Sequence, residues 1–264
     1  MTADKIAAII LLVSLTFRTG LQVNWNQLIA VVKNYRLLSR ALLANFVIVP
    51  ILGVLFVRVF HLNAYVATGV LLMAISPGAL TVLMSTRKKG ESLEFAVSLA
   101  FIMPVISIIT VPLTAVLVLP QNEAARLPVA QFVLLLVLFQ LLPLLLGVVV
   151  ADRAPTLAPK LDRPAALIFL ASLLILVVLL APMAATGVAT VYGSNGMWAI
   201  LCIVVLSVAT GWLLGGPQRE MRRTLGIATS LRKVGLGLLV ATTSFPKTEV
   251  AFTVLTYFLI QFVV

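Results

Sequence analysis

Residues 224–244 read TLGIATSLRKVGLGLLVATTS, an apolar segment with polar and charged side chains at its centre. The segment is long enough to cross a bilayer, because a transmembrane helix needs about 20 predominantly apolar residues. Its centre nevertheless holds Ser230, Arg232 and Lys233, followed by Gly235 and Gly237. Irregular or polar backbone at membrane depth occurs only where it is buried in protein or lines a cavity. The segment therefore predicts a broken transmembrane helix inside a larger membrane protein.

A similar interruption, Ser76-Pro77-Gly78, lies in the middle of the apolar run 64–86. Proline removes a helix hydrogen bond and glycine relaxes the backbone, so the helix should break there. Interrupted spans at corresponding positions in two halves of a chain point to the binding site of a transporter. Taken singly, such residues have a simpler interpretation, since proline and glycine also kink ordinary transmembrane helices.

The composition agrees with a membrane protein. Of the 264 residues, 62% are apolar and 10% are charged, against about 45–50% and about 25% in soluble domains. A soluble globular protein and a disordered chain are therefore excluded. The apolar runs lack the period-two alternation of barrel strands, so we expect one all-α polytopic membrane domain over residues 1–264. Its nine predicted spans are 6–24, 37–60, 64–86, 92–119, 128–151, 164–186, 196–216, 224–244 and 248–264.

The 19 Lys and Arg residues outnumber the 8 Asp and Glu residues and cluster between the apolar runs. Every odd-numbered loop holds three of them, and every even-numbered loop holds one or none. The odd-loop residues are Lys33, Arg36, Arg40, Arg87, Lys88, Lys89, Arg153, Lys160, Arg163, Arg219, Arg222 and Arg223. The positive-inside rule then places the N-terminus outside and the C-terminus in the cytoplasm. This pattern indicates a lipid bilayer and not nucleic acid as the partner. The short loops and the absence of a signal-peptide pattern favour a bacterial inner membrane.

The sequence does not favour enzymatic chemistry. Cys202 and His61 are the single cysteine and the single histidine, which excludes by count an internal disulfide and a zinc site of His and Cys ligands. The spans contain no evident carboxylate pair, and no Gly-rich phosphate loop indicates ATP-driven transport. We therefore expect neither an enzyme nor a bound cofactor or metal.

Three segments resemble the bile acid:sodium symporter family of secondary transporters. They are Ser76-Pro77-Gly78-Ala79 with Thr81 and residues 87–90, residues 225–236 with Phe245-Pro246, and Ala44-Asn45-Phe46 with Pro50. The resemblance implies ten helices in two inverted repeats whose broken helices cross, and this chain is similar to a member without the first helix. Spans three and eight are five apart and so run in opposite directions, which fits an inverted repeat. The implied panel is 6–24, 128–151 and 164–186, and the implied core is 37–119 and 196–264.

The resemblance also implies sodium ligands, which this sequence largely lacks. Where sodium-coupled members carry Ser-Asn, this chain has Val82 and Leu83, and where they carry glutamate and glutamine, it has Ala228 and Arg232. Only Asn45 resembles a sodium-site amide. Sodium is a hard cation that needs oxygen ligands, so we expect sodium coupling through these sites to be lost.

Arg232 and Lys233 are the leading candidates for a binding role. Burying a charge at the membrane centre costs about 2.5–3.5 kcal/mol on insertion scales, so two adjacent cations indicate a function. Arginine can hold a carboxylate or sulfonate with two parallel hydrogen bonds. A second hypothesis is that one cation permanently replaces the sodium charge. A third places both residues at the end of a shorter span, which leaves only residues 234–245 to cross.

The remaining candidates surround the two breaks. A half-helix after a break offers free N–H groups to an anion. On this ground the predicted substrate-binding residues are Ser76, Pro77, Gly78, Thr81, Ser230, Gly235 and Asn45, in addition to Arg232 and Lys233. For Asn45, a hydrogen bond to a neighbouring helix is the alternative role. Glu91, Glu94 and Glu249 are alternative proton-coupling groups or interfacial ion-pair partners.

The sequence therefore predicts a secondary active or facilitative transporter of a small or amphipathic organic anion. It would work by alternating access and without sodium coupling through the usual family sites. Two alternatives remain. One is a sodium-coupled bile acid-type symporter with a rebuilt ion site, and the other is a non-transporting, ligand-sensing membrane domain.

Overall fold

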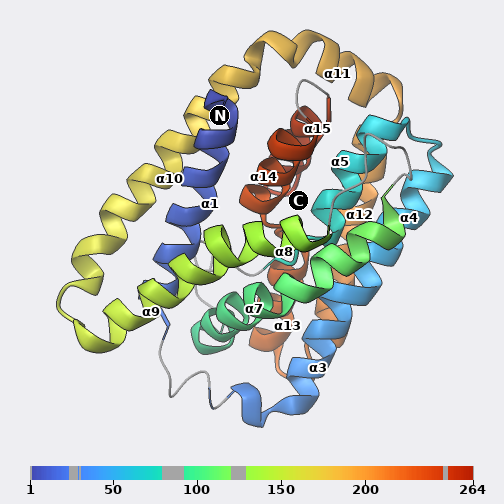
Figure 1. Cartoon of the computed structure of the whole chain (residues 1–264). Helices are drawn as coiled ribbons and strands as arrows, with labels where there is room; N and C mark the ends of the chain where they lie inside the picture. Colours follow the sequence, from blue (N-terminus) through green and yellow to red (C-terminus); the bar gives the residue numbers. More distant parts are fainter. Residues whose placement is uncertain are drawn as a thin grey trace.

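The computed structural model describes residues 2–23, 29, 31–78, 92–119, 129–245 and 249–263. Every regular element among these residues is helical, which confirms the predicted all-α fold (Figure 1). In chain order the elements are α1 (Ala3–Leu21), α3 (Tyr35–Leu43), the π-helix η1 (Ala44–Ile48), α4 (Val49–Val59), α5 (Ala64–Ile75), α7 (Leu93–Val118), α8 (Val129–Leu136), the π-helix η3 (Val137–Leu141), α9 (Leu142–Arg153), α10 (Ala158–Leu180), the 3₁₀-helix η4 (Ala181–Met183), α11 (Ala184–Gly193), α12 (Gly196–Leu214), α13 (Arg219–Ser230), α14 (Val234–Ser244) and α15 (Val250–Ile260).

Several helices are long and apolar enough to cross a membrane. Among the described residues there are six: Tyr35–Val59, Phe95–Val118, Val129–Arg153, Ala158–Leu180, Gly196–Leu214 and Arg219–Ser244. The apolar helices α5 and α15 are shorter, and α1 carries Asp4, Lys5 and Arg18 within its 19 residues. The chain is thus a polytopic membrane protein, while nine spans stays a prediction.

The sixth predicted span, 164–186, is displaced in the structure. Helix α10 begins at Ala158, and Pro164, which the prediction placed at the helix start, lies inside it. Pro159 stands in the first turn instead, where backbone N–H groups have no helical partner and proline is tolerated. The helix ends at Leu180, and α11, which the sequence did not predict as a separate helix, connects it to α12 (Figure 1).

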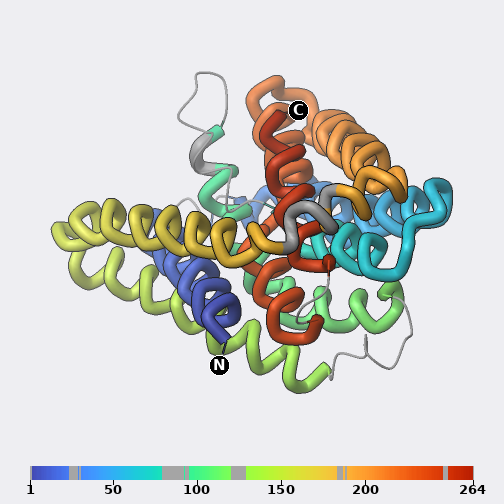
Figure 2. The backbone as a smooth tube through the Cα atoms, turned by 90° about the horizontal axis from the view of Figure 1, so that it is seen from above, coloured from blue at the N-terminus to red at the C-terminus, as the bar shows by residue number. Residues whose placement is uncertain are grey.

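The helices α14 and α15 lie at the centre of the molecule. Helix α1 packs against α9 and α10 on one side, and α12 packs against α13 and α4 on the other. Seen from above, the C-terminal helices lie between the α1–α9–α10 group and the α4–α5 group (Figure 2). Helix α14 contacts α1, α5 and α15. The second half of the second broken helix therefore contacts helices of both outer groups, α1 on one side and α5 on the other.

Close backbone contacts hold neighbouring helices together in both groups. A Cβ atom added to Gly20 of α1 would lie 2.9 Å from the Cα of Gly147 in α9. One added to Gly211 of α12 would lie 2.6 Å from the Cα of Gly226 in α13. Such distances are too short for a side chain. Small residues of this kind let transmembrane helices pack closely, because packing and not the hydrophobic effect drives their association in lipid.

Candidate functional site

The first predicted break is present in the structure. Helix α5 ends at Ile75, and Ser76 is extended, with φ −77° and ψ 108°. The Ser76 hydroxyl donates a hydrogen bond of 2.6 Å to the carbonyl oxygen of Leu72, which satisfies an acceptor in the last turn. Because Pro77 has no N–H to continue the helix, the chain leaves α5 here.

The second predicted break has the same backbone conformation. Helix α13 ends at Ser230, Leu231 is extended with φ −78° and ψ 100°, and α14 starts at Val234. Arg232 and Lys233 therefore lie in the non-helical segment itself. Their side chains are 0% and 2% exposed, so both cations are inside the protein. This burial argues against the alternative in which both residues lie at the exposed end of a shorter span.

The two breaks touch each other through their backbones. A Cβ atom added to Gly78 would overlap the carbonyl oxygen of Ala228, in the last turn of α13, and that of Leu231, in the second break. Only a residue without a side chain allows the chains to approach so closely. Gly78 is thus the contact point at which the two interrupted helices meet.

Replacing Gly78 with alanine should destabilise the protein strongly. The new methyl group would collide with backbone atoms, which cannot rotate away as a flexible side chain can, and overpacking of this kind costs about 3 kcal/mol. We expect a lower Tm for the purified protein in detergent. Gly193→Ala is the matched control, because a Cβ there meets no atom within 4 Å. An unchanged Tm for Gly78→Ala would mean that the breaks do not meet at Gly78.

Arg232 is held by oxygens from three separate segments of the chain. Its Nη1 atom donates to the carbonyl oxygen of Ser76 at 3.2 Å and to both the carbonyl oxygen and Oδ1 of Asn45 at 3.5 Å. Its backbone N–H donates to Oε1 of Gln261 at 2.7 Å, and Nε2 of Gln261 donates back to the carbonyl oxygen of Arg232 at 3.4 Å. Arg232 thereby links the first break, η1 and the residue that follows α15.

The local structure around Asn45 explains why its carbonyl is available. Asn45 lies in the π-helix η1, where the N–H of Val49 bonds to the carbonyl oxygen of Ala44, five residues earlier. The corresponding donor for the Asn45 carbonyl would be Pro50, which has no N–H. Short π-helices are frequent at functional sites. Asn45 and Pro50, which resemble a segment of the symporter family, therefore lie where the carbonyl oxygen of Asn45 accepts a hydrogen bond from Arg232.

Lys233 points toward a different group of helices. Its Nζ atom donates to Oε1 of Gln140, which lies in the second π-helix, η3. Nε2 of Gln140 in turn donates to the carbonyl oxygen of Pro104 at 2.9 Å and to Oγ of Ser107 at 2.8 Å, both in α7. Gln140 and Ser107 are fully buried. The two adjacent cations therefore connect to different helices: Arg232 to η1 and Lys233 to η3.

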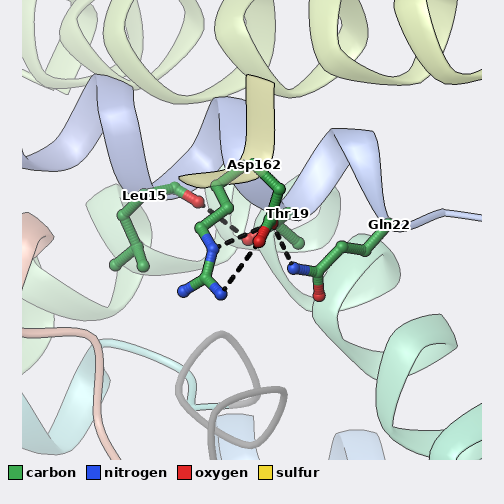
Figure 3. A network of polar contacts seen from close by, with 5 residues as sticks. Leu15, Thr19, Gln22 and Asp162 are labelled. Atoms are coloured by element: carbon green, nitrogen blue, oxygen red, sulfur yellow. Dashed lines mark hydrogen bonds and ion pairs between the residues drawn. The ribbon is translucent and has the colours of Figure 1, made fainter. Parts of the chain in front are cut away.

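Neither cation has a carboxylate partner among the described residues. The one ion pair found in that part of the chain joins Arg18 of α1 to Asp162 of α10 (Figure 3). Arg18 donates from Nε to Oδ1 at 2.9 Å and from Nη2 to Oδ2 at 3.3 Å. Gln22 adds a bond of 2.7 Å from Nε2 to Oδ1. Arg18 thus has a carboxylate partner, whereas Arg232 and Lys233 have none in the part of the chain that the structure describes.

Replacing Asp162 with asparagine should weaken the contact between α1 and α10. The change removes a charge-assisted, two-point interaction that is only partly exposed, and such bonds contribute about 1.5–3 kcal/mol. We expect the Tm in detergent to fall by about 5 °C. Asp152→Asn, at an exposed position on α9, should leave the Tm unchanged. If Asp162→Asn and Asp152→Asn changed the Tm equally, the hydrogen bonds from Arg18 and Gln22 to Asp162 would not contribute to stability.

The other predicted binding residues lie near the breaks in different ways. Ser76 contributes its carbonyl oxygen and not its hydroxyl to Arg232. The Ser230 hydroxyl donates to its own helix at Ile227, and Gly235 packs against Leu11 of α1. Thr81, Val82, Leu83, Glu91 and the cluster 87–89 lie outside the described residues, as does the side chain of Glu94. Glu249 accepts a hydrogen bond from Thr190. The binding role of each predicted residue stays a prediction.

Gln140, Tyr257 and Gln261 were not predicted as site residues. A usable signal existed for Gln140, since a polar amide inside the apolar run 128–151 needs a partner, as the amide of Asn45 does. Tyr257 and Gln261 gave no comparable signal, because tyrosine is common near the ends of transmembrane helices and Gln261 lies close to the end of the apolar run 248–264.

An apolar groove of about 350 Å³ lies elsewhere, between α1 and α10. It is lined by Ile9, Val13, Phe17, Leu161 and their neighbours and offers no charged group to an anion.

The chain was compared with known proteins and protein families. The sequence model of the Sodium Bile acid symporter family matches residues 9–191. The match includes the larger part of α1, the first break and Gln140, while the second break lies beyond it. The comparison with curated proteins finds no match. Because the family match covers well over half of the 264 residues, this chain belongs to the sodium bile acid symporter family, a family of membrane transporters.

Proposed function

We propose that this protein moves a small or amphipathic organic anion across the membrane by alternating access. The observation that carries the proposal is the burial of Arg232 and Lys233 at the contact between the two breaks, with no carboxylate partner among the described residues. An anionic substrate would supply the missing negative charge. The proposed location is a bacterial inner membrane, with the N-terminus outside and the C-terminus in the cytoplasm.

The charges set the sign of the substrate. Two adjacent buried cations are costly at membrane depth, and each loses most of its hydration. A neutral substrate would not offset this cost, and a cationic one would increase it. An anion instead gains two charge-assisted hydrogen-bonding partners in a medium of low dielectric constant, where such interactions are strongest.

The same geometry supports transport without sodium at this place. The Nη1 atom of Arg232 lies among the carbonyl oxygen of Ser76 and two oxygens of Asn45, and oxygen atoms are the ligands that hard cations take. A guanidinium fixed among these atoms already supplies a positive charge. Lys233 beside it adds further repulsion toward a second cation. We therefore propose that substrate movement does not depend on a sodium ion bound here.

The bond between Lys233 and Gln140 suggests how movement follows binding. It joins the proposed core, 37–119 and 196–264, to helix 129–153 of the proposed panel. Motion of the core against the panel must break this bond. An anion that takes the place of Gln140 at Lys233 would therefore favour release of the two parts, which couples binding to alternating access.

Thermal shifts of the purified full-length chain test this proposal. Glycocholate, taurocholate, benzoate, benzenesulfonate, acetate and methanesulfonate serve as probes, each measured in sodium and in choline buffer. We expect at least one organic anion to raise the Tm equally in both buffers, because ligand binding stabilises the folded state by mass action. A shift that requires sodium would instead favour a symporter with a rebuilt ion site. No shift with any anion would overturn the proposal.

A further inference from the structure

Three buried donor groups near the second break have no hydrogen-bond partner among the described residues. They are Nε and Nη2 of Arg232 and the hydroxyl group of Tyr257. Both side chains are fully buried. Buried donors are normally paired, because a donor without a partner loses its bonds to water and gains none in return. Such a group in a membrane interior needs an explanation, and a bound ligand is one.

The unpaired atoms of Arg232 form one edge of the guanidinium group. The Nη1 atom on the other side is engaged by Ser76 and Asn45. Nε and Nη2 point two N–H groups in parallel, with a spacing that matches the two oxygens of a carboxylate. The contacts of Nη1 hold the group in place, so this edge is presented in a fixed orientation.

The same chain holds a carboxylate with the same edge elsewhere. Arg18 binds Asp162 through Nε at 2.9 Å and Nη2 at 3.3 Å, and Gln22 supplies a third donor to Oδ1 (Figure 3). Arg232 offers the equivalent two N–H groups. The hydroxyl group of Tyr257 is the third donor available beside them.

The position of Tyr257 follows from the helix that carries it. Tyr257 lies one turn before Gln261 and so on the same face. Gln261 exchanges two hydrogen bonds with the backbone of Arg232, which fixes this face of α15 against the break. The hydroxyl of Tyr257 lies close enough to the guanidinium group to interact with it, and neither the hydroxyl nor Nε or Nη2 has a hydrogen bond of normal geometry among the described residues. A shared ligand atom can satisfy both groups.

We propose that the Nε–Nη2 edge of Arg232 and the hydroxyl of Tyr257 bind a carboxylate group of the transported anion. This inference rests on the proposed function and narrows it from organic anions to carboxylates. Around Asp162 two carboxylate oxygens take all three donors, with Nε of Arg18 and Nε2 of Gln22 sharing Oδ1. If the three donors at Arg232 and Tyr257 are shared in the same way, the third oxygen of a sulfonate has no donor of its own. The site is closed to solvent in this conformation, and the carboxylate enters as the helices around the breaks separate.

Matched pairs of anions test the inference in sodium-free buffer. Glycocholate and taurocholate, benzoate and benzenesulfonate, and acetate and methanesulfonate each differ chiefly in the acidic group. For the full-length chain we expect the carboxylate of at least one pair to bind about 10-fold more tightly than its sulfonate, measured by thermal shift titration. Arg232→Lys keeps the positive charge but lacks the two parallel N–H groups of the guanidinium. The ratio of carboxylate affinity to sulfonate affinity should therefore fall to about one, while anion binding remains.

Tyr257→Phe tests the third donor without removing a charge. It should weaken carboxylate binding about 10-fold and leave sulfonate binding unchanged. Tyr192→Phe, at an exposed position on α11, should change neither. If Arg232→Lys does not fold, Tyr257→Phe alone decides. Anion binding without carboxylate preference, or a preference that both variants retain, would overturn this inference and leave the proposed function intact. No anion binding at all would overturn the proposed function itself.

Discussion

Replacing Arg232 with glutamine is expected to weaken binding of the stabilising anion by about 100-fold or more. Glutamine retains a donor for the carbonyl oxygen of Ser76. It removes the positive charge and the two parallel N–H groups of Nε and Nη2. Hydrogen bonds to charged groups contribute about 1.5–3 kcal/mol each, and each 1.4 kcal/mol corresponds to about a tenfold change in affinity. The measurement is the concentration of anion that gives half of the maximal thermal shift.

The same substitution should not lower the stability of the protein without anion. An uncompensated charge at membrane depth costs about 2.5–3.5 kcal/mol on insertion scales, and removing it returns part of that cost. We expect the Tm of Arg232→Gln without anion to equal or exceed that of the wild type. Arg58→Gln, at an exposed position on α4, controls for the loss of one charge. Anion affinity that is unchanged in Arg232→Gln would remove this residue from the binding site.

Replacing Gln140 with glutamate is expected to reduce transport strongly. The new carboxylate would lie within bonding distance of Lys233, where the amide oxygen lies now. A buried ion pair between the proposed core and panel would neutralise Lys233 and resist the separation of the two parts. We expect uptake of the anion to fall at least about tenfold, with an unchanged or higher Tm.

Two further variants separate charge from packing at this position. Gln140→Met is close in volume and carries no charge, so it should retain anion binding even though Lys233 loses its tether. Gln131→Glu places the same new charge at an exposed position on α8 and should leave uptake unaltered. Wild-type uptake by Gln140→Glu would mean that the bond between Lys233 and Gln140 is not broken during transport.

Both breaks were predictable because their signals are local. Pro77-Gly78 in an apolar run favours an interrupted helix through the backbone properties of these two residues alone. Arg232 and Lys233 in the centre of a span must be buried or lie near a cavity, and the structure buries both. The sequence did not indicate that the two side chains point to different helices. That difference follows from the contacts of Arg232 with Asn45 and of Lys233 with Gln140.

Pairings between distant helices could not be predicted. Arg18 pairs with Asp162, 144 residues away along the chain, and nothing in the sequence near either residue indicates this pairing. Gln140 is 93 residues from Lys233. Such contacts depend on how the helices pack against one another, and this packing cannot be inferred from a single sequence. The start of α10 was also misplaced, because a proline inside a helix and a proline at its first turn look alike in sequence.

The central claim is that the two cations at the meeting point of the breaks carry an organic anion without sodium. Uptake of the most stabilising anion, radiolabelled, into proteoliposomes containing the full chain tests it most directly. The account predicts saturable uptake that is equal in choline and sodium buffer, lost in Arg232→Gln and retained in Arg58→Gln. Uptake that requires an inward sodium gradient and survives Arg232→Gln would contradict the account.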